Sequence, residues 1–275
     1  MADMVMVLTS ANGVSDEQVA AALAGQATEA PRRLSEKAVE ARMRGAPQPV
    51  ALAGVDANFV PANNRRKKLL IADMDSTIIP VECIDELADF AGVKERIAEI
   101  TETAMRGEIG FEESLEARVA LLAGLEEEAL ERAYRERISL NPGARDMVQA
   151  MNKSGAYTAL VSGGFTYFTE KVAADAGFQH NRANTLNMAN GVLDGTVGKP
   201  ILGREAKLEA MDELCAMRGI TRADVIAVGD GANDLAMIEA AGLGVAYHAK
   251  PALKARADVV LDHSDLTALL AFQGL

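Results

Sequence analysis

The sequence lacks several features that would point to common protein classes. It has no tryptophan and only 4% aromatic residues, so a core must be built from aliphatic side chains and the 12 methionines. The two cysteines, Cys83 and Cys215, are too few for a disulfide framework. No run approaches the roughly 20 apolar residues of a membrane helix, and the start of the chain lacks the basic and apolar regions of a signal peptide. We therefore expect a soluble, cytoplasmic protein.

Positive charge is also scarce. The formal net charge is −12, with a pI near 4.8, which disfavours nucleic acid or an anionic membrane as a partner because their phosphates would be repelled. A small anionic substrate needs a local positive site in such a chain, for example a metal ion. The three histidines, His180, His248 and His263, are scattered without the spacing of metal ligands, and we expect them to be surface or ordinary structural residues.

The 275 residues are 49% hydrophobic, enough for a substantial core, and their pattern alternates between short apolar runs and amphipathic segments. We expect strands over residues 68–72, 157–161, 225–228, 244–246 and 259–261, and helices over residues 144–153, 166–176, 204–218 and 234–241. This alternation predicts an α/β fold with a doubly wound, Rossmann-like parallel sheet. Asn190-Gly191 between partly apolar runs predicts a β-hairpin.

Two segments depart from this alternation. Residues 1–66 predict a small N-terminal α+β segment, with strands over 4–8 and 50–53 and helices over 16–23 and 34–44. Residues 82–140 are helical in pattern and predict a helical cap inserted after the first strand of a core that spans residues 67–275. An insertion there would lie above the carboxyl ends of the strands, where open α/β sheets bind ligands.

The first core strand runs into Asp73-Met74-Asp75-Ser76-Thr77. Two carboxylates two residues apart repel each other and call for a cation or a shared proton. Oxygen ligands of this kind suit Mg²⁺. An EF-hand is excluded because its sixth position would be Ile78 instead of glycine.

A second acidic cluster, Gly229-Asp230-Gly231-Ala232-Asn233-Asp234, also ends a predicted strand. A helix cap would account for one of its acids, but not for two acids and two glycines. Between the clusters, Ser162-Gly163-Gly164 joins a strand to a helix and could bind phosphate through a hydroxyl and backbone amides, although plain turn chemistry also produces it. Walker A, Gly-x-Gly-x-x-Gly and Gly-x-Ser-x-Gly patterns are absent. The residues alone thus indicate a Mg²⁺-dependent phosphomonoesterase.

Taken together and in this order, the motifs resemble those of the haloacid dehalogenase superfamily, and within it the phosphoserine phosphatase family. The resemblance covers residues 67–275. The matching positions are Asp73 to Thr77, Pro80 to Leu87, Met105 to Gly107, Phe111 to Leu115, Arg118-Val119, Val161 to Phe165, Lys207 and Gly229 to Asp234.

This resemblance implies the hydrolysis of O-phospho-L-serine to L-serine and phosphate, the last step of serine biosynthesis. Asp73 would be the nucleophile that forms an aspartyl-phosphate, and Asp75 the general acid and then base. Mg²⁺ would be held by Asp73, the carbonyl of Asp75 and Asp230, with Asp234 in support.

The resemblance also implies how substrate is bound. Phosphate oxygens would be held by Ser162, the Gly163 amide and Lys207, with Asn233 nearby. From the cap, Glu82 would pair with the substrate's ammonium group and Arg118 with its carboxylate, and Met105 and Phe111 would close the site. Without the family, Glu82 and Arg118 would be ordinary surface charges and Lys207 a surface lysine.

Three alternatives remain open. The same chemistry could act on another small phosphomonoester such as phosphohomoserine, as a phosphatase or a phosphotransferase. A phospho-accepting switch domain is disfavoured, because Asp75 would hydrolyse its phosphoaspartate quickly. A catalytically inactive relative is disfavoured because every core motif is present. We expect a monomer or a homodimer, and the role of residues 1–66 stays open.

Overall fold

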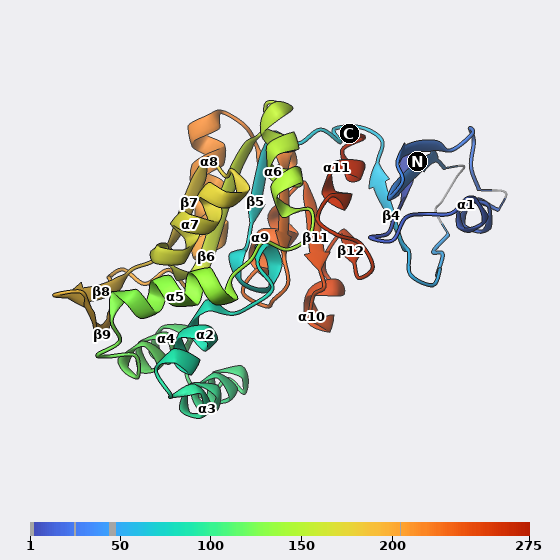
Figure 1. Cartoon of the computed structure of the whole chain (residues 1–275). Helices are drawn as coiled ribbons and strands as arrows, with labels where there is room; N and C mark the ends of the chain where they lie inside the picture. The colour runs from blue at the N-terminus through green and yellow to red at the C-terminus, as the bar shows by residue number, and fades with distance from the viewer. Residues whose placement is uncertain (1–2, 25, 44–47, 204) are drawn as a thin grey trace.

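Six parallel strands form the centre of the molecule, in the order β12-β11-β10-β5-β6-β7 (Figure 1). The computed structural model describes residues 3–24, 26–43, 48–203 and 205–275. The strands of this sheet are β5 (Leu69–Ala72), β6 (Tyr157–Phe165), β7 (His180–Asn184), β10 (Val225–Gly229), β11 (Leu243–Tyr247) and β12 (Val259–Leu261). The expected parallel sheet is confirmed, with β7 as a strand that the sequence pattern did not predict.

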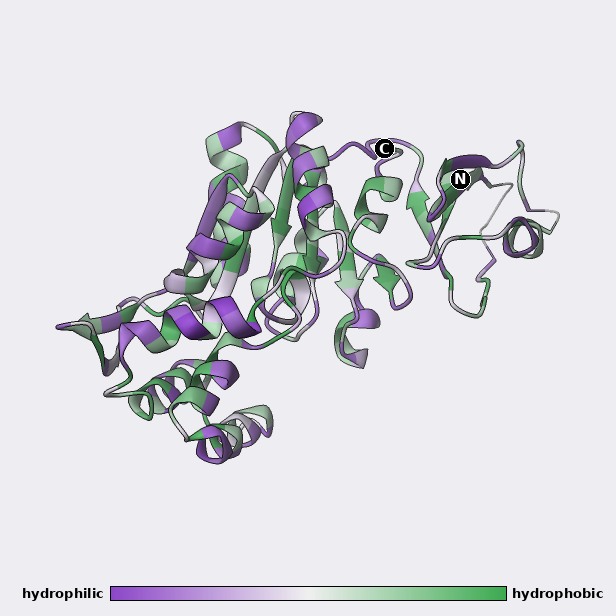
Figure 2. Ribbon diagram, in the orientation of Figure 1, coloured by the Kyte–Doolittle hydropathy of each residue, from purple (hydrophilic) through white to green (hydrophobic). Residues whose placement is uncertain are grey.

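Helices cover both faces of this sheet because side chains alternate along each strand. In β5, Leu69 and Ile71 pack in the layer of α8 (Ala206–Arg218) and α9 (Leu235–Ala240). Leu70 and Ala72 pack in the other layer, which includes α6 (Ala144–Lys153), α7 (Thr166–Ala176) and α11 (Ala268–Phe272). The short helix α10 (Pro251–Lys254) lies between β11 and β12. Figure 2 shows mostly hydrophobic strands in the centre of the sheet between helices on which hydrophobic and hydrophilic residues alternate. Within the described residues, no helix is both long and apolar enough to cross a membrane.

The expected helical insertion is present between β5 and α6. It consists of α2 (Cys83–Phe90), α3 (Lys94–Met105), α4 (Phe111–Ala120) and α5 (Glu127–Arg137). The hairpin of β8 (Leu186–Ala189) and β9 (Val192–Val197) projects beside α4 and α5 (Figure 1). Its turn is formed by Asn190 and Gly191, with φ angles of 54° and 76°, as the Asn-Gly pair predicts.

The N-terminal sheet is antiparallel, in the order β2-β3-β1-β4. Its elements are β1 (Met4–Thr9), α1 (Asp16–Leu23), β2 (Arg32–Ser35), β3 (Ala38–Arg42) and β4 (Asp56–Pro61). The predicted helix over 34–44 is wrong, because residues 38–42 pair with β1 and bury Val39 and Ala41; Arg44 lies outside the described residues. The strand expected over 50–53 is also wrong, and β4 pairs with β1 instead.

Side chains of β4 join the two sheets. Asn58 Nδ2 donates to the Val260 carbonyl at 2.8 Å, and the Val260 amide donates to Asn58 Oδ1 at 2.9 Å. Asp56 accepts from the backbone amides of Asp262 and His263 at 3.0 and 2.9 Å. Both side chains are buried. The N-terminal sheet therefore lies against the edge strand β12 of the core.

Candidate active site

Asp73 directly follows β5, at the carboxyl end of the parallel sheet. Its backbone amide donates to the Val228 carbonyl at 3.0 Å and extends the β5–β10 ladder by one residue. Its Oδ1 accepts from the Met74 amide at 2.7 Å, and the residue is only 3% exposed. A carboxylate this deep needs compensating charge.

Lys207 supplies one such charge from α8. Its Nζ lies 2.6 Å from Asp73 Oδ1 and 2.6 Å from Asp234 Oδ1. Burial alone would lower the pKa of Lys207, but the carboxylates of Asp234 and Asp73 raise it, so the amine stays protonated. Lys207 is therefore an interior cation behind the site instead of a surface lysine.

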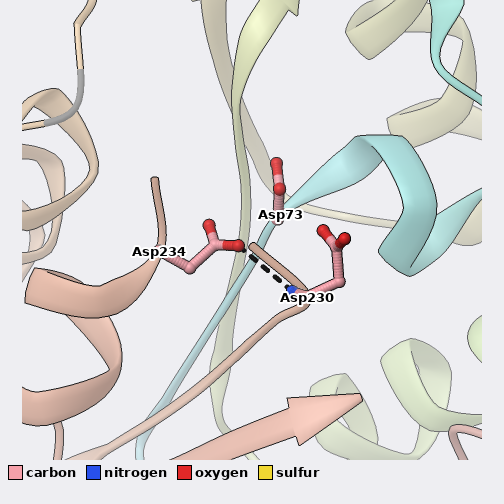
Figure 3. A group of neighbouring side chains, drawn as sticks. All are labelled: Asp73, Asp230 and Asp234. Carbon is pink, nitrogen blue, oxygen red and sulfur yellow. Dashed lines mark hydrogen bonds between the residues drawn. The ribbon is translucent and has the colours of Figure 1, made fainter. Parts of the chain in front are cut away.

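The loop after β10 folds around Asp234. Its Oδ2 accepts from the backbone amide of Asp230 at 3.1 Å (Figure 3) and from that of Gly231 at 3.0 Å. A Cβ at Gly229 would lie 2.4 Å from Asp234 Cγ, so a side chain there would displace the carboxylate. Asp234 thus holds the loop, while the side chain of Asp230 extends to the same side as that of Asp73 (Figure 3).

The three aspartates form a candidate metal centre. One carboxylate oxygen from each of Asp73, Asp230 and Asp234 lies within 4.8 Å of the others. Burial, together with the charge of Asp234, raises the pKa of Asp73, and burial with the charges of Asp234 and Glu82 raises the pKa of Asp230 to about 6. Such crowding of acids is relieved by a cation, and an all-oxygen donor set suits a hard divalent ion.

Asp75 lies on the turn after Asp73, in η1 (Met74–Ile78), where the backbone angles of Asp75 and Ser76 are not helical. Its Oδ1 accepts from the Cys83 amide at 3.0 Å, and its Oδ2 from the Ser162 hydroxyl at 3.3 Å. The Ser162 hydroxyl in turn accepts from the Gly164 amide at 2.8 Å. Burial and the charge of Glu82 raise the pKa of Asp75 to about 7. Asp75 is thus fixed between the start of the cap and the end of β6.

The cap forms the opposite wall. Glu82 precedes α2, and its Oε1 accepts from the Ser76 hydroxyl at 2.7 Å. Arg118 on α4 donates from Nε to the Ser114 carbonyl at 3.2 Å, which uses one of its five N–H groups, and burial lowers its pKa. Phe111 lies so close to Gly163 that a Cβ there would be 3.3 Å from the ring. Met105 is 71% exposed at the rim.

These walls enclose a cavity of about 430 Å³ that brings most of the predicted residues together. Its lining includes Asp73, Asp75, Glu82, Met105, Phe111, Arg118, Ser162, Gly163, Asp230 and Asn233. The remaining two, Lys207 and Asp234, lie behind it, and Lys207 pairs with both Asp73 and Asp234. Asn233 Nδ2 approaches Asp73 Oδ2 at 3.5 Å.

Charged residues missed by the sequence reasoning also line the cavity. Asp85, whose pKa burial raises, lies on α2, and Lys250 lies in the loop between β11 and α10. The Lys250 amide donates to the Asp230 carbonyl at 3.0 Å. A signal existed only for Lys250, because it follows a predicted strand at the carboxyl edge of the sheet. Asp85 looks like any acid in the first turn of a helix.

Comparison with known proteins gives consistent results. The family profile of haloacid dehalogenase-like hydrolases matches residues 70–239. A phosphoserine phosphatase from Archaeoglobus fulgidus is 45% identical over 218 residues, which are 78% of this chain and 63% of that protein. The chain therefore spans less than two thirds of that relative's length.

Solved structures extend the similarity to both parts of the chain. A phosphoserine phosphatase solved as a phospho-aspartyl intermediate analogue superposes with a TM-score of 0.70 at 40% identity, covering 75% of this chain and 99% of that one. A haloacid dehalogenase family hydrolase from Salmonella enterica serovar Typhi has a TM-score of 0.86 at 26% identity, and the match covers 98% of both chains.

Proposed function

The chain belongs to the haloacid dehalogenase-like hydrolases, and from this premise we propose that it hydrolyses O-phospho-L-serine to L-serine and phosphate through an aspartyl-phosphate. The observation that carries the proposal is one cavity lined by two groups of residues. Asp73 and Asp75 lie at the sheet edge, and Glu82 and Arg118 lie on the cap. The first pair suits phosphoryl transfer, and the second suits a zwitterionic amino acid.

Asp73 is the proposed nucleophile. Its Oδ1 is occupied by Lys207 and the Met74 amide. Its Oδ2 has only the long 3.5 Å contact from Asn233 Nδ2 and is therefore the oxygen that attacks phosphorus. As the P–O bond to the substrate breaks, Asp75 donates a proton to the departing seryl oxygen. Asp75 then takes a proton from the water that hydrolyses the phosphoaspartate and regenerates Asp73. A pKa of about 7 suits Asp75 to both roles near neutral pH.

Mg²⁺ is the proposed cofactor. Asp73, Asp230 and the backbone carbonyl of Asp75 would hold it, while Asp234, whose oxygens are bonded to Lys207 and the loop amides, orients the loop. When bound, the ion neutralises charge on the transferring phosphoryl group.

The phosphoryl group itself would be held by the chain's own donors. These are the Ser162 hydroxyl, the Gly163 amide and Asn233, which line the cavity, and Lys207, which lies directly behind Asp73. A Lys and backbone amides placed in this way stabilise charge on phosphate oxygens.

The cap, proposed as residues 82–140, would select the substrate. Glu82 pairs with its ammonium group and Arg118 with its carboxylate, for which the guanidinium keeps free N–H donors. Met105 and Phe111 cover the opening and exclude water. The relatives named above as phosphoserine phosphatases support this substrate, one of them solved as a phospho-aspartyl intermediate analogue.

The test is phosphate release from O-phospho-L-serine, O-phospho-L-threonine, phosphohomoserine and an aryl phosphate, each with Mg²⁺ and with EDTA. We expect Mg²⁺-dependent release with a strong preference for O-phospho-L-serine, and no turnover by Asp73→Asn, because an amide is a poor nucleophile and a weak metal ligand. Release without that preference would keep the chemistry and reject the substrate. Near wild-type activity of Asp73→Asn would reject the mechanism.

A further inference from the structure

Ser76 has an unusual backbone. Its φ angle is 56°, in the left-handed region that non-glycine residues seldom adopt. The conformation is held by the loop around it, since the Ser76 amide donates to the Val81 carbonyl at 3.3 Å and the Ile79 amide to the Met74 carbonyl at 3.0 Å. A strained residue that its surroundings hold in place is a reason to look for a role.

The strained residue directs its side chain at the cap. The Ser76 hydroxyl donates to Glu82 Oε1 at 2.7 Å. Ser76 belongs to the turn that carries Asp75, whereas Glu82 is the residue that precedes the first cap helix. The bond therefore links the turn over Met74–Ile78, which carries Asp75, directly to the cap.

Glu82 needs such a link to stay in the cavity. Its side chain makes no capping hydrogen bond to α2, and the residue is exposed. It shares the cavity with the carboxylates of Asp75 and Asp230, which repel it, and with the guanidinium of Arg118, which attracts it. Such opposed charges do not by themselves hold a long, exposed acidic side chain in one orientation. The Ser76 hydroxyl occupies Oε1 and leaves Oε2 to accept a hydrogen bond from a ligand.

We propose that Ser76 is a positioning residue that holds Glu82 ready for the ammonium group of the substrate, and so sets the preference for amino-bearing phosphomonoesters. The inference rests on the proposed function, because it takes Glu82 as the ammonium site. Ser76 itself touches neither phosphorus nor the leaving oxygen in this scheme.

The experiment compares two substrates that differ only at the ammonium group, O-phospho-L-serine and 3-phosphonooxypropanoate, with Mg²⁺ present. The readout is the ratio of their kcat/KM values for the full chain and for Ser76→Ala, Ser76→Gly, Glu82→Gln and Ser76→Ala/Glu82→Gln. Ser76→Gly removes the hydroxyl but suits a positive φ, so it separates the hydrogen bond from backbone strain. Ser154→Ala, which loses a 2.7 Å hydroxyl bond to Met151 at the end of α6, is the matched control.

We expect Ser76→Ala and Ser76→Gly to lower the ratio about three- to tenfold, through KM for O-phospho-L-serine. This is less than the roughly tenfold or more that a lost hydrogen bond to a charged group would cost, because Glu82 is misplaced and not removed. Glu82→Gln should lower the ratio at least as much, and the double variant should match Glu82→Gln because the two residues act as one unit. Ser154→Ala should keep the wild-type ratio.

Three results would overturn the inference. If Glu82→Gln lowers the ratio and the Ser76 variants do not, Ser76 has no positioning role while the proposed function stands. If Ser76→Ala lowers both kcat/KM values equally, or lowers the ratio further in the Glu82→Gln background, Ser76 acts independently of Glu82. If Glu82→Gln leaves the ratio unchanged, Glu82 is not the ammonium site and the proposed substrate recognition fails with it.

Discussion

At the scale of single residues, charge balance governs the site. Asp73, Asp230 and Asp234 share one centre in which Lys207 already pairs with two of them. Burial and the charges of Asp234 and Glu82 raise the pKa of Asp230 to about 6, and burial and the charge of Glu82 raise that of Asp75 to about 7. Each of these carboxyls stabilises the metal-free fold only while it is protonated. That contribution is complete below about pH 4 and is lost as pH rises through 6 to 7.

Stabilisation by Mg²⁺ should therefore increase with pH. Deprotonated carboxylates bind the ion, so Mg²⁺ at about 100 times its Kd should raise Tm by about 5–10 °C at pH 8. The increase should be much smaller at pH 5, where Asp230 is protonated. Thermal unfolding with Mg²⁺ and with EDTA at both pH values measures this, and Asp230→Asn serves as the control that loses the effect. An equal Tm increase at both pH values would place the bound ion elsewhere.

Gly164 shows how closely the turn that carries Asp75 and the end of β6 approach each other. A Cβ there would lie 2.8 Å from Asp75 Oδ2 and 3.1 Å from the Ser162 hydroxyl. Gly164→Ala should push Asp75 from its position and lower kcat by at least about tenfold, while the fold is retained. Steady-state kinetics with circular dichroism check this. Gly110→Ala, where a Cβ meets nothing within 4 Å, is the matched control, and similar kinetics for both variants would contradict the assigned position of Asp75.

How far the sequence predicts the site depends on how local each signal is. Asp73 and Asp75 were predictable because a buried strand is followed at once by two acids with one residue between them, and the loop from Gly229 to Asp234 also places acids after a strand. The backbone conformation of Ser76 was not predictable, because a serine in a sequence does not indicate a φ of 56°. The burial of Lys207 was not predictable either, since it depends on the carboxylates of Asp73 and Asp234, which lie 134 and 27 positions away along the chain.

At the scale of elements, helices with a regular apolar spacing were predicted well, whereas strands defined mainly by their pairing with other strands were not. The helices over 144–153 and 166–176 were confirmed with the predicted bounds, since their apolar spacing is regular. The helix over 34–44 was wrong because its polar residues fit a helix equally well and only pairing with β1 decides for a strand. The strand β7 was missed because four of its five residues are polar, so it lacks the apolar pattern of a buried strand.

The cap helix α4 carries a further prediction through Arg118. Burial lowers the pKa of this guanidinium, and its bond to the Ser114 carbonyl leaves donors for an anion. Arg118→Ala should raise KM for O-phospho-L-serine about 10- to 100-fold, the value of hydrogen bonds to a charged group, and leave KM for an aryl phosphate nearly unchanged. Initial-rate kinetics on both substrates decide this. Equal losses on both would mean that Arg118 only supports the fold of the cap.

At the scale of the whole molecule, the N-terminal sheet stands out as an addition to the catalytic core. The phosphoserine phosphatase structure that matches 75% of this chain is itself covered over 99% of its length, so a phosphatase fold exists without such a sheet. In this chain the sheet lies against β12, the edge of the core. We propose that residues 1–66 act as a cover for this edge, since exposed edge strands pair with other chains and aggregate.

Asn58 tests this cover most directly. Its amide both donates to and accepts from the backbone of Val260, as a neighbouring strand would. Asn58→Leu keeps a side chain of similar size but leaves both backbone groups without their partner, so the free energy of unfolding should fall by about 1–3 kcal/mol. Urea unfolding measures the free energy of unfolding. The control is Asn12→Leu, the same change at an exposed position in the turn between β1 and α1, which should alter that free energy by less than about 0.5 kcal/mol.

The same variant also separates shielding from catalysis. Asn58 lies outside the cavity, so Asn58→Leu should keep kcat for O-phospho-L-serine while its loosened edge promotes association, which light scattering at increasing protein concentration would detect. Unfolding and light scattering like those of the unchanged protein would mean that β4 only touches β12 and does not protect it. Loss of kcat without association would instead couple the N-terminal sheet to the active site, because a disturbance at β12 would then have reached the strand ends that carry Asp73 and Asp230.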